Sequence, residues 1–250
     1  MVIYLTSVVI LTKTVIIPGG LNEHRMNTRM AFYVWLMMAS AAALLTPVRA
    51  GAQWWATSAD EIEPLAPLLE LKPGSAVAEI GAGNGAVAVA AAKRVGPSGH
   101  IYATEIDRDQ IARIRDRIST SGLHNVSVIE AVADSSNLSA RCCDTIYMIG
   151  VYHHLTEPLK TDASILQALR PGGRLVVIDF RPSFWLKPWT PKGIPANRGG
   201  HGIPPGVLQD ELRHAGFQIT KIYPQWGHSL FLNNYCVVAS KPLTQTSAVR

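Results

Sequence analysis

The sequence is poor in cysteine, and the few cysteines that it has follow no functional spacing. Cys142, Cys143 and Cys236 form neither a C-x-x-C pair nor a pattern of zinc ligands. Adjacent cysteines seldom pair with each other because the ring that they would close is strained. We therefore interpret all three as apolar residues close to strands, and we predict no metal site.

Charged residues are also scarce. They make up 16% of the 250 residues, against 48% hydrophobic residues, and this apolar balance suggests a membrane-related segment. The net charge is +5, but the basic residues are scattered and form no uninterrupted tract. This favours a mildly basic surface over a nucleic-acid interface, and we expect no nucleic-acid partner. The length suits one domain with an N-terminal extension.

The first fifty residues contain the apolar segment MAFYVWLMMASAAALL (30–45), which follows Arg25 and Arg29 and precedes small residues at Ala50 and Ala52. A basic start, an apolar middle and a small-residue exit are typical of a secretory signal. The segment is short for a spanning helix, which needs about 20 apolar residues.

We predict three N-terminal parts from this pattern. They are an extra or mis-assigned extension over 1–25, a signal peptide or membrane anchor over 26–52, and a helical lead-in over 53–70. Because positive residues before an apolar segment stay inside, we expect an exported, periplasmic or membrane-anchored domain. Membrane association would then run through residues 30–45.

From residue 71 onward, apolar runs alternate with amphipathic stretches. The pattern predicts strands and helices in turn: strands at 75–80, 100–106, 126–131, 143–150 and 174–180, and helices at 85–96, 108–122 and 162–173. Such alternation predicts an α/β fold with a Rossmann-like, doubly wound and mostly parallel sheet. The loops after the strands then meet at one edge, where ligands bind.

The last part of the chain departs from this alternation. A helix is expected at 206–217, followed by two β-rich runs at 218–225 and 231–241 with no room for a helix between them. A short link forces an antiparallel hairpin, so the sheet should end in one. We place the main domain at 71–241 and a flexible tail at 242–250. The irregular insert 181–205, rich in proline and aromatic residues, is interpreted as a lid over the substrate.

The stretch AEIGAGNGAV (78–87) places a glycine-rich loop directly after the first strand. Gly81, Gly83 and Ala86 formally satisfy G-x-G-x-x-G/A, and Glu105 follows as the acidic residue. No G-x-x-x-x-G-K-[ST] occurs, which excludes a triphosphate P-loop. Glu79 before the glycines would repel a pyrophosphate and suits a ligand with positive charge. An NAD-linked oxidoreductase remains the less favoured reading.

Several motifs in order resemble the class I S-adenosylmethionine-dependent methyltransferases over about residues 71–241. They are VAEIGAGNG, YATEID, VADSSNL, IYMIGVYHHL, LRPGGRLVVIDF, LRHAGF and YCVVASKP. The resemblance implies S-adenosyl-L-methionine as the cofactor. It also implies a set of cofactor-binding residues: Glu79, Gly81, Gly83, Gly85, Glu105, Ala133, Asp134, Ile149 and Gly150.

The resemblance gives some of these residues a definite role. Glu79 would fix the methionine amino group, and Glu105 would accept hydrogen bonds from both ribose hydroxyls. Asp134 with the Ala133 backbone would read the adenine. Ile149 and Gly150 would flank the cofactor at the end of the fourth strand.

Methyl transfer from a sulfonium is an in-line displacement, so positioning in a dry pocket supplies much of the acceleration. A base is needed only where the nucleophile starts protonated, and His153 and Asp179 are the candidates. The insert and the fourth strand suggest an acceptor pocket for a small or lipid-like molecule, formed by Tyr152, His154, Trp185, Trp189 and His201.

A second class of function stays open. Because S-adenosylmethionine is made in the cytoplasm, an exported domain would meet little of it. The alternative is therefore an exported, non-catalytic binding protein on the same fold. For an active enzyme, the cofactor supply makes a cytoplasmic location the alternative to export.

Overall fold

The computed structural model describes residues 58–227 and 233–243, together with all their side chains except that of Trp185. These residues belong to one of the two units into which the chain divides, the unit that begins at Ala52. The predicted segments 1–25 and 26–52 lie outside the described residues, as does most of the predicted tail.

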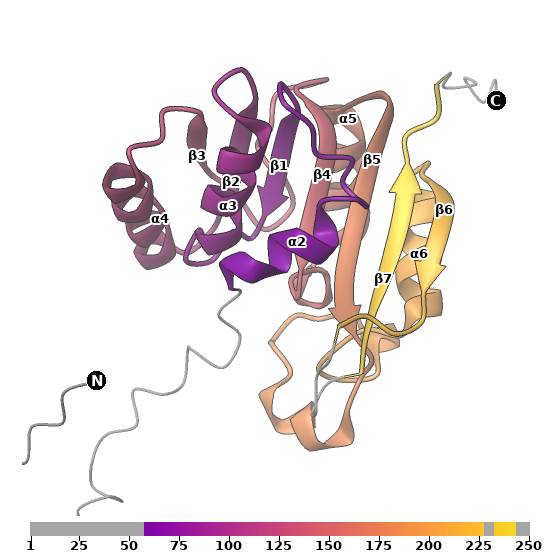
Figure 1. Cartoon of the computed structure of the whole chain (residues 1–250). Helices are drawn as coiled ribbons and strands as arrows, with labels where there is room; N and C mark the ends of the chain where they lie inside the picture. Colours follow the sequence, from indigo (N-terminus) through magenta and orange to yellow (C-terminus); the bar gives the residue numbers. More distant parts are fainter. Residues whose placement is uncertain (1–57, 228–232, 244–250) are drawn as a thin grey trace, which may run out of the picture. The chain divides into compact units, whose positions relative to one another are not determined.

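A seven-stranded sheet in the order β3-β2-β1-β4-β5-β7-β6 forms the centre of the domain (Figure 1). Its strands are β1 (Ala76–Ile80), β2 (His100–Glu105), β3 (Val126–Glu130), β4 (Cys143–Ile149), β5 (Leu169–Phe180), β6 (Gln218–Tyr223) and β7 (Asn234–Ser240). The first five strands pair in parallel, whereas β7 is antiparallel to both β5 and β6. The predicted fold class and the antiparallel ending are confirmed.

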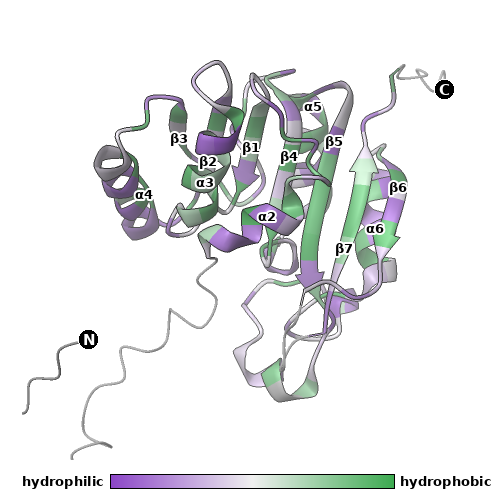
Figure 2. Ribbon diagram, in the orientation of Figure 1, coloured by the Kyte–Doolittle hydropathy of each residue, from purple (hydrophilic) through white to green (hydrophobic). Residues whose placement is uncertain are grey.

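Helices cover both faces of this sheet. They are α2 (Ile62–Leu65), α3 (Ala86–Val95), α4 (Arg108–Ser121), α5 (Pro158–Ala168) and α6 (Pro205–His214), with α2 preceded by the 3₁₀ helix η1 (Ala59–Glu61). One apolar core joins α2, α3 and α4 to one face, and a second core joins α5 and α6 to the other. Figure 2 shows the resulting pattern, with hydrophobic strands inside and a largely hydrophilic α4.

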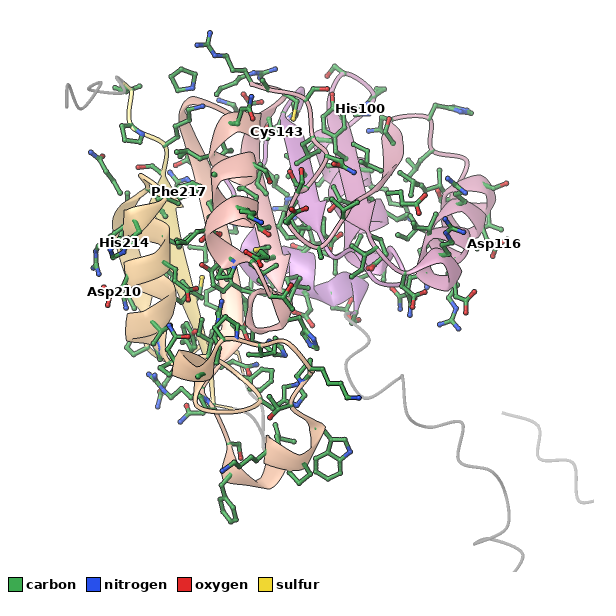
Figure 3. All side chains as sticks on the ribbon, turned by 180° about the vertical axis from the view of Figure 1, so that it is seen from behind. His100, Asp116, Cys143, Asp210, His214 and Phe217 are labelled. Atoms are coloured by element: carbon green, nitrogen blue, oxygen red, sulfur yellow. The ribbon has the colours of Figure 1, made fainter. Side chains whose placement is uncertain are left out.

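Helix α4 illustrates how local sequence sets an element. Asp107 caps its start, because its carboxylate accepts from the backbone N of Asp109 (2.8 Å) and of Gln110 (3.0 Å). Ile111 and Ile114 are buried, and the helix ends at Gly122 with φ +67°. Asp116 lies on this helix, at the opposite end of the sheet from Asp210 and His214 on α6 (Figure 3).

The predicted helix over 162–173 is wrong at both ends. Helix α5 begins at Pro158, which suits a first helical turn, and it stops at Ala168. Leu169 has an extended backbone, is fully buried and pairs with Cys143, so it opens β5 instead. The Pro-Gly-Gly segment therefore lies inside the strand, next to an irregularity in the pairing between Cys143 and Thr145.

The insert 181–205 contains two short 3₁₀ helices, η3 (Phe184–Trp189) and η4 (Ala196–Arg198). Phe184 and Trp189 are exposed, at 71% and 67%, while Arg198 is fully buried. Its action as a lid stays a prediction. Within residues 58–227 and 233–243, no helix combines the length and the apolar character needed to cross a membrane.

Candidate functional site

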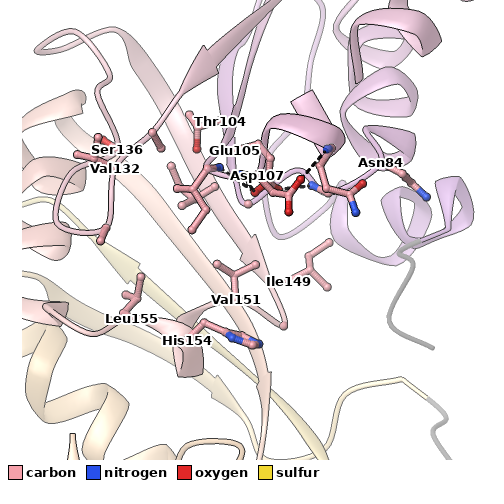
Figure 4. A pocket seen from close by; sticks show the side chains of 18 of the residues that line it. Asn84, Thr104, Glu105, Asp107, Val132, Ser136, Ile149, Val151, His154 and Leu155 are labelled. Atoms are coloured by element: carbon pink, nitrogen blue, oxygen red, sulfur yellow. Dashed lines mark hydrogen bonds between the residues drawn. The ribbon is translucent and has the colours of Figure 1, made fainter. Parts of the chain in front are cut away.

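A cavity of about 1040 Å³ opens at the carboxyl ends of β1, β2, β3 and β4. Its wall includes Gly81, Glu105, Ala133, Ile149 and His154. Figure 4 shows Glu105 and Asp107 on the side near Asn84, with His154 and Val151 on the opposite side. The cavity therefore lies at the sheet edge where a doubly wound fold binds its ligand.

The glycine loop turns sharply as it leaves β1. The backbone N of Gly81 and of Ala82 both donate to the Thr104 carbonyl at 2.9 Å, which ties the loop to β2. Gly81 has φ +71°, and a Cβ there would lie 2.6 Å from Val151 Cγ2. Only glycine fits this position, because both its φ and its close neighbour exclude a side chain.

Glu105 is held by three backbone amides. Its Oε2 accepts from Gly83 N at 2.8 Å, and its Oε1 accepts from Ile106 N at 2.8 Å and Asp107 N at 3.1 Å. The residue is only 9% exposed. These hydrogen bonds fix the direction of the carboxylate at the cavity wall, between the glycine loop and β2.

The structure brings most of the predicted cofactor residues to one place. Six of them line the cavity: Gly81, Gly83, Glu105, Ala133, Ile149 and Gly150. Gly85 instead caps α3 with φ +74°, and a Cβ on it would meet Ile114 at 3.2 Å.

Glu79 lies behind the cavity wall. Strand alternation places it on the same face as Val77, against the core that contains Tyr147. It is 2% exposed, and burial raises the pKa of its carboxyl to about 8, with further contributions from Glu61 and Glu105. The carboxyl is therefore mostly neutral at pH 7, and its predicted contact with the cofactor stays a prediction.

Asp134 also lies off the cavity wall. Its side chain is 50% exposed, and Oδ2 lies 3.9 Å from Lys160 Nζ. Its neighbours Ala133 and Ser135 do line the cavity. The loop after β3 thus approaches the ligand space at this position, while the Asp134 carboxylate interacts with a surface lysine.

The two candidate catalytic residues are in direct contact. Asp179 Oδ1 lies 2.8 Å from His153 Nδ1, and Asp179 Oδ2 accepts from the His153 backbone N at 3.0 Å. Both side chains are almost fully buried, at 1% and 2% exposure. His154, in contrast, lines the cavity. Partial burial of the ring, together with the neighbouring His153 and His201, lowers the pKa of His154 to about 4, so its imidazole is neutral at pH 7.

The predicted acceptor residues have different positions. Tyr152 is buried in the core, and its hydroxyl donates to Asp162 Oδ2 at 2.6 Å. His201 is 7% exposed, and its ring lies 5.0 Å from that of His153. Trp189 is exposed and is not among the cavity residues. The side chain of Trp185 is not among those that the structure describes.

Comparison with known proteins identifies the family. Residues 71–201 match the methyltransferase domain family. The chain belongs to that family. The predicted relationship to class I methyltransferases is thereby confirmed.

Curated relatives of the chain also have methyltransferase names. The ubiquinone/menaquinone biosynthesis C-methyltransferase UbiE of Bordetella parapertussis is 34% identical over 138 residues, covering 50% of this chain and 52% of the relative. The chain thus spans about half the length of the curated relatives it matches.

Two solved structures share the fold. A SAM-dependent methyltransferase from Aquifex aeolicus has a TM-score of 0.54 at 20% identity, covering 74% of this chain and 100% of that one. The [4+2]-cyclase SpnF has a TM-score of 0.61 at 19% identity, covering 84% and 96%. Similarity at this level concerns the fold, and chemistry has to be argued from the site.

Two of the cavity residues that the sequence did not point to stand out by their exposure. Ile106 and Val132 are large hydrophobic residues, 61% and 49% exposed, and both line the cavity. Ile106 directly follows β2, and Val132 is the second residue after β3, on the ligand edge. An apolar residue immediately after the acidic end of a strand is the signal that could have found Ile106.

Proposed function

We propose that this protein is an S-adenosylmethionine-dependent methyltransferase that transfers the methyl group to a small or lipid-like acceptor. The observation that carries this proposal is the Glu105 carboxylate, fixed by three backbone amides at the cavity wall. A carboxylate has about four acceptor positions, and the three amides occupy three of them, so Oε2 keeps capacity for one further donor, a hydroxyl of a ribose. The family relationship supports the same cofactor.

The glycine loop favours a nucleoside without a diphosphate. A pyrophosphate is normally bound by free backbone N–H groups at the start of a helix. Here Gly81 N and Ala82 N donate to Thr104, Gly83 N donates to Glu105, and Gly85 N donates to the Ala82 carbonyl at 2.8 Å. These donors are already used within the protein, which argues against NAD at this loop.

Two apolar side chains favour a position for the adenine between them. Ile106 and Val132 face the cavity from neighbouring strand ends, with Glu105 next to Ile106 in the chain. A flat aromatic base between two apolar side chains would bury their exposed surface. The ribose would then lie within reach of Glu105, and the sulfonium would point toward Ile149 and Gly150.

The acceptor would approach from the side of Val151, His154 and Leu155, opposite Glu105 (Figure 4). With a pKa of about 4, His154 is a weak base, so its contribution would be positioning. His153 and Asp179 stay candidates for a base toward a protonated acceptor. Curated relatives named as ubiquinone/menaquinone biosynthesis C-methyltransferases favour a small acceptor. An export or anchoring role for residues 26–52 is part of the same proposal.

Isothermal titration tests the cofactor directly. We expect S-adenosylhomocysteine to bind and NAD not to bind. Glu105→Gln should weaken binding about 10- to 100-fold, the value of a charge-assisted hydrogen bond. Glu130→Gln is the matched control, because Glu130 pairs with Glu105 in the sheet register but points to Arg108 at the surface. Equal affinity in both variants would contradict the role of Glu105.

A transfer assay separates catalysis from binding. Cofactor carrying a tritium-labelled methyl group is incubated with small phenols, quinols and phospholipid vesicles, and labelled products are counted. Transfer to one acceptor class supports the enzyme. Tight binding of the cofactor with no transfer to any of them would favour the non-catalytic binding protein.

A further inference from the structure

Three histidines gather next to the cavity, although one of them is far from the other two in the sequence. His153 and His154 come from η2 (Tyr152–His154), and His201 comes from the insert. One ring nitrogen from each can be chosen so that all three lie within 4.8 Å of one another. The ring centroids are 4.1 Å apart for His153 and His154, and 5.0 Å apart for His153 and His201.

Asp179 fixes the direction and the tautomer of His153. Its carboxylate accepts from the Phe180 backbone N at 2.8 Å as well as from the ring and backbone nitrogens of His153. A carboxylate at Nδ1 places the ring proton there, so Nε2 carries the lone pair. That Nε2 is buried and has no hydrogen-bond partner among the described residues. A buried nitrogen of this kind calls for an explanation.

We propose that His153, His154 and His201 bind a divalent transition-metal ion. Imidazole nitrogens suit zinc, copper, nickel and cobalt, whereas magnesium and calcium prefer oxygen ligands. A carboxylate that receives the second ring N–H of a ligand histidine is the usual partner in such sites, and Asp179 occupies that place.

The geometry requires only a small adjustment. Nitrogens about 2.0–2.1 Å from a tetrahedral ion lie roughly 3.4 Å from one another. The three nitrogens here are within 4.8 Å, and His154, the exposed member of the set, can rotate toward the two buried ones. The loss of side-chain mobility on metal binding falls mainly on His154, because the other two histidines are buried.

The position of the ion would link it to the cavity. Three protein ligands leave one coordination position for water or for an oxygen of a bound molecule. Because His154 lines the cavity, that position would lie at the end where the acceptor approaches. Metal binding itself does not depend on the proposed methyl transfer.

The test is metal binding by the full chain without an affinity tag, since polyhistidine tags bind the same ions. Co²⁺ is titrated and followed by its visible absorption, then displaced with Zn²⁺. We expect one equivalent to bind and the intensity to be that of a four-coordinate site. His154→Gln and His201→Gln should each weaken binding roughly 100-fold or more, because losing a ligand costs more than losing its orienting group.

Two variants serve as controls. His214→Gln alters an exposed histidine on the outer side of α6 (Figure 3) and should leave Co²⁺ affinity unchanged. Asp179→Asn keeps all three histidines and should weaken binding about 10- to 100-fold, since Asp179 is a positioning residue.

The proposal is overturned if the wild type takes up no equivalent of Co²⁺, or if His154→Gln binds as the wild type does. His154 is exposed, so this variant remains decisive even if His201→Gln fails to fold. Titration of S-adenosylhomocysteine on the same samples separates the two proposals, because failure of the metal site leaves cofactor binding intact.

Discussion

Arg198 Nη2 lies 2.9 Å from Glu211 Oε2, and this ion pair joins the insert to helix α6. The side chain of Arg198 is fully buried and that of Glu211 is 12% exposed. The guanidinium also lies 5.2 Å from the centre of the Tyr152 ring. The insert is therefore fastened to the domain by a buried charge, even though its sequence shows no periodicity.

Loss of this arginine should destabilise the fold. Arg198→Met is expected to lower the free energy of unfolding by about 3–5 kcal/mol, because Glu211 would keep a buried charge without its partner. Urea denaturation measures the difference. Arg213→Met is the matched control: Arg213 lies at the same 2.9 Å from Asp210, but both side chains are more than half exposed. Arg213→Met should lower the free energy of unfolding by at most about 1 kcal/mol. Equal losses in the two variants would contradict a special contribution of the buried pair.

Much of the fold could be predicted from the sequence because parallel strands are buried on both faces. Strands such as Ala76–Ile80 therefore appear as short apolar runs, and Asp107 and Gly122 mark the ends of α4 by local capping alone. The end of α5 could not be predicted in this way. Leu169 leaves the helix because it pairs with Cys143, and that contact depends on tertiary structure.

The candidate site, too, contains residues that local sequence predicts and residues whose positions depend on tertiary structure. Glu105 could be placed at the cavity because it ends a strand at a known offset from the glycines. Glu79 and Asp134 are not among the residues that line the cavity, and the direction of their side chains depends on strand phase and loop conformation. The meeting of His153 and His201 depends on the path of the insert, which no local pattern encodes.

Glu79 should make stability depend on pH. Its pKa is about 8 in the folded protein against an ordinary 4.5, so the folded state holds an extra proton between these values. The contribution of Glu79 to the stability of the folded state is fully present below about pH 4.5 and is lost as the pH rises through 8. Glu79→Gln removes the effect, so the melting temperature of the variant minus that of the wild type should rise between pH 5 and pH 9. Asp162, whose pKa is also raised, is present in both proteins and cancels.

Thermal denaturation across this pH range provides the measurement. Glu130→Gln is the control, since Glu130 is exposed on the neighbouring part of the sheet. Its difference from the wild type should not vary in the same way. A flat difference for Glu79→Gln would show that the carboxyl titrates as it does in water.

Gly81 should tolerate no side chain, for two separable reasons. Gly81→Ala places a Cβ at φ +71° and 2.6 Å from Val151 Cγ2. Gly122→Ala has a similar φ of +67° but nothing within 4 Å. We expect about 1–2 kcal/mol of destabilisation from backbone conformation in both, and about 1–3 kcal/mol more in Gly81→Ala from crowding. Adding Val151→Ala should recover the crowding part only, and recovery of the whole loss would refute the contribution of φ.

Ile106 and Val132 should contribute to ligand binding without contributing to folding. Both side chains are about half exposed or more, so replacing either with serine removes little buried surface and should leave the melting temperature nearly unchanged. In the complex, however, an adenine between them would cover that surface. Ile106→Ser should therefore weaken binding of S-adenosylhomocysteine about 5- to 30-fold, in line with roughly 1–2 kcal/mol for a newly buried aliphatic side chain. Leu159→Ser is the matched control, because Leu159 is 54% exposed but is not among the residues that line the cavity. If Leu159→Ser and Ile106→Ser bound the ligand equally well, the adenine would have to lie elsewhere in the cavity, and the direction in which the sulfonium points would change with it.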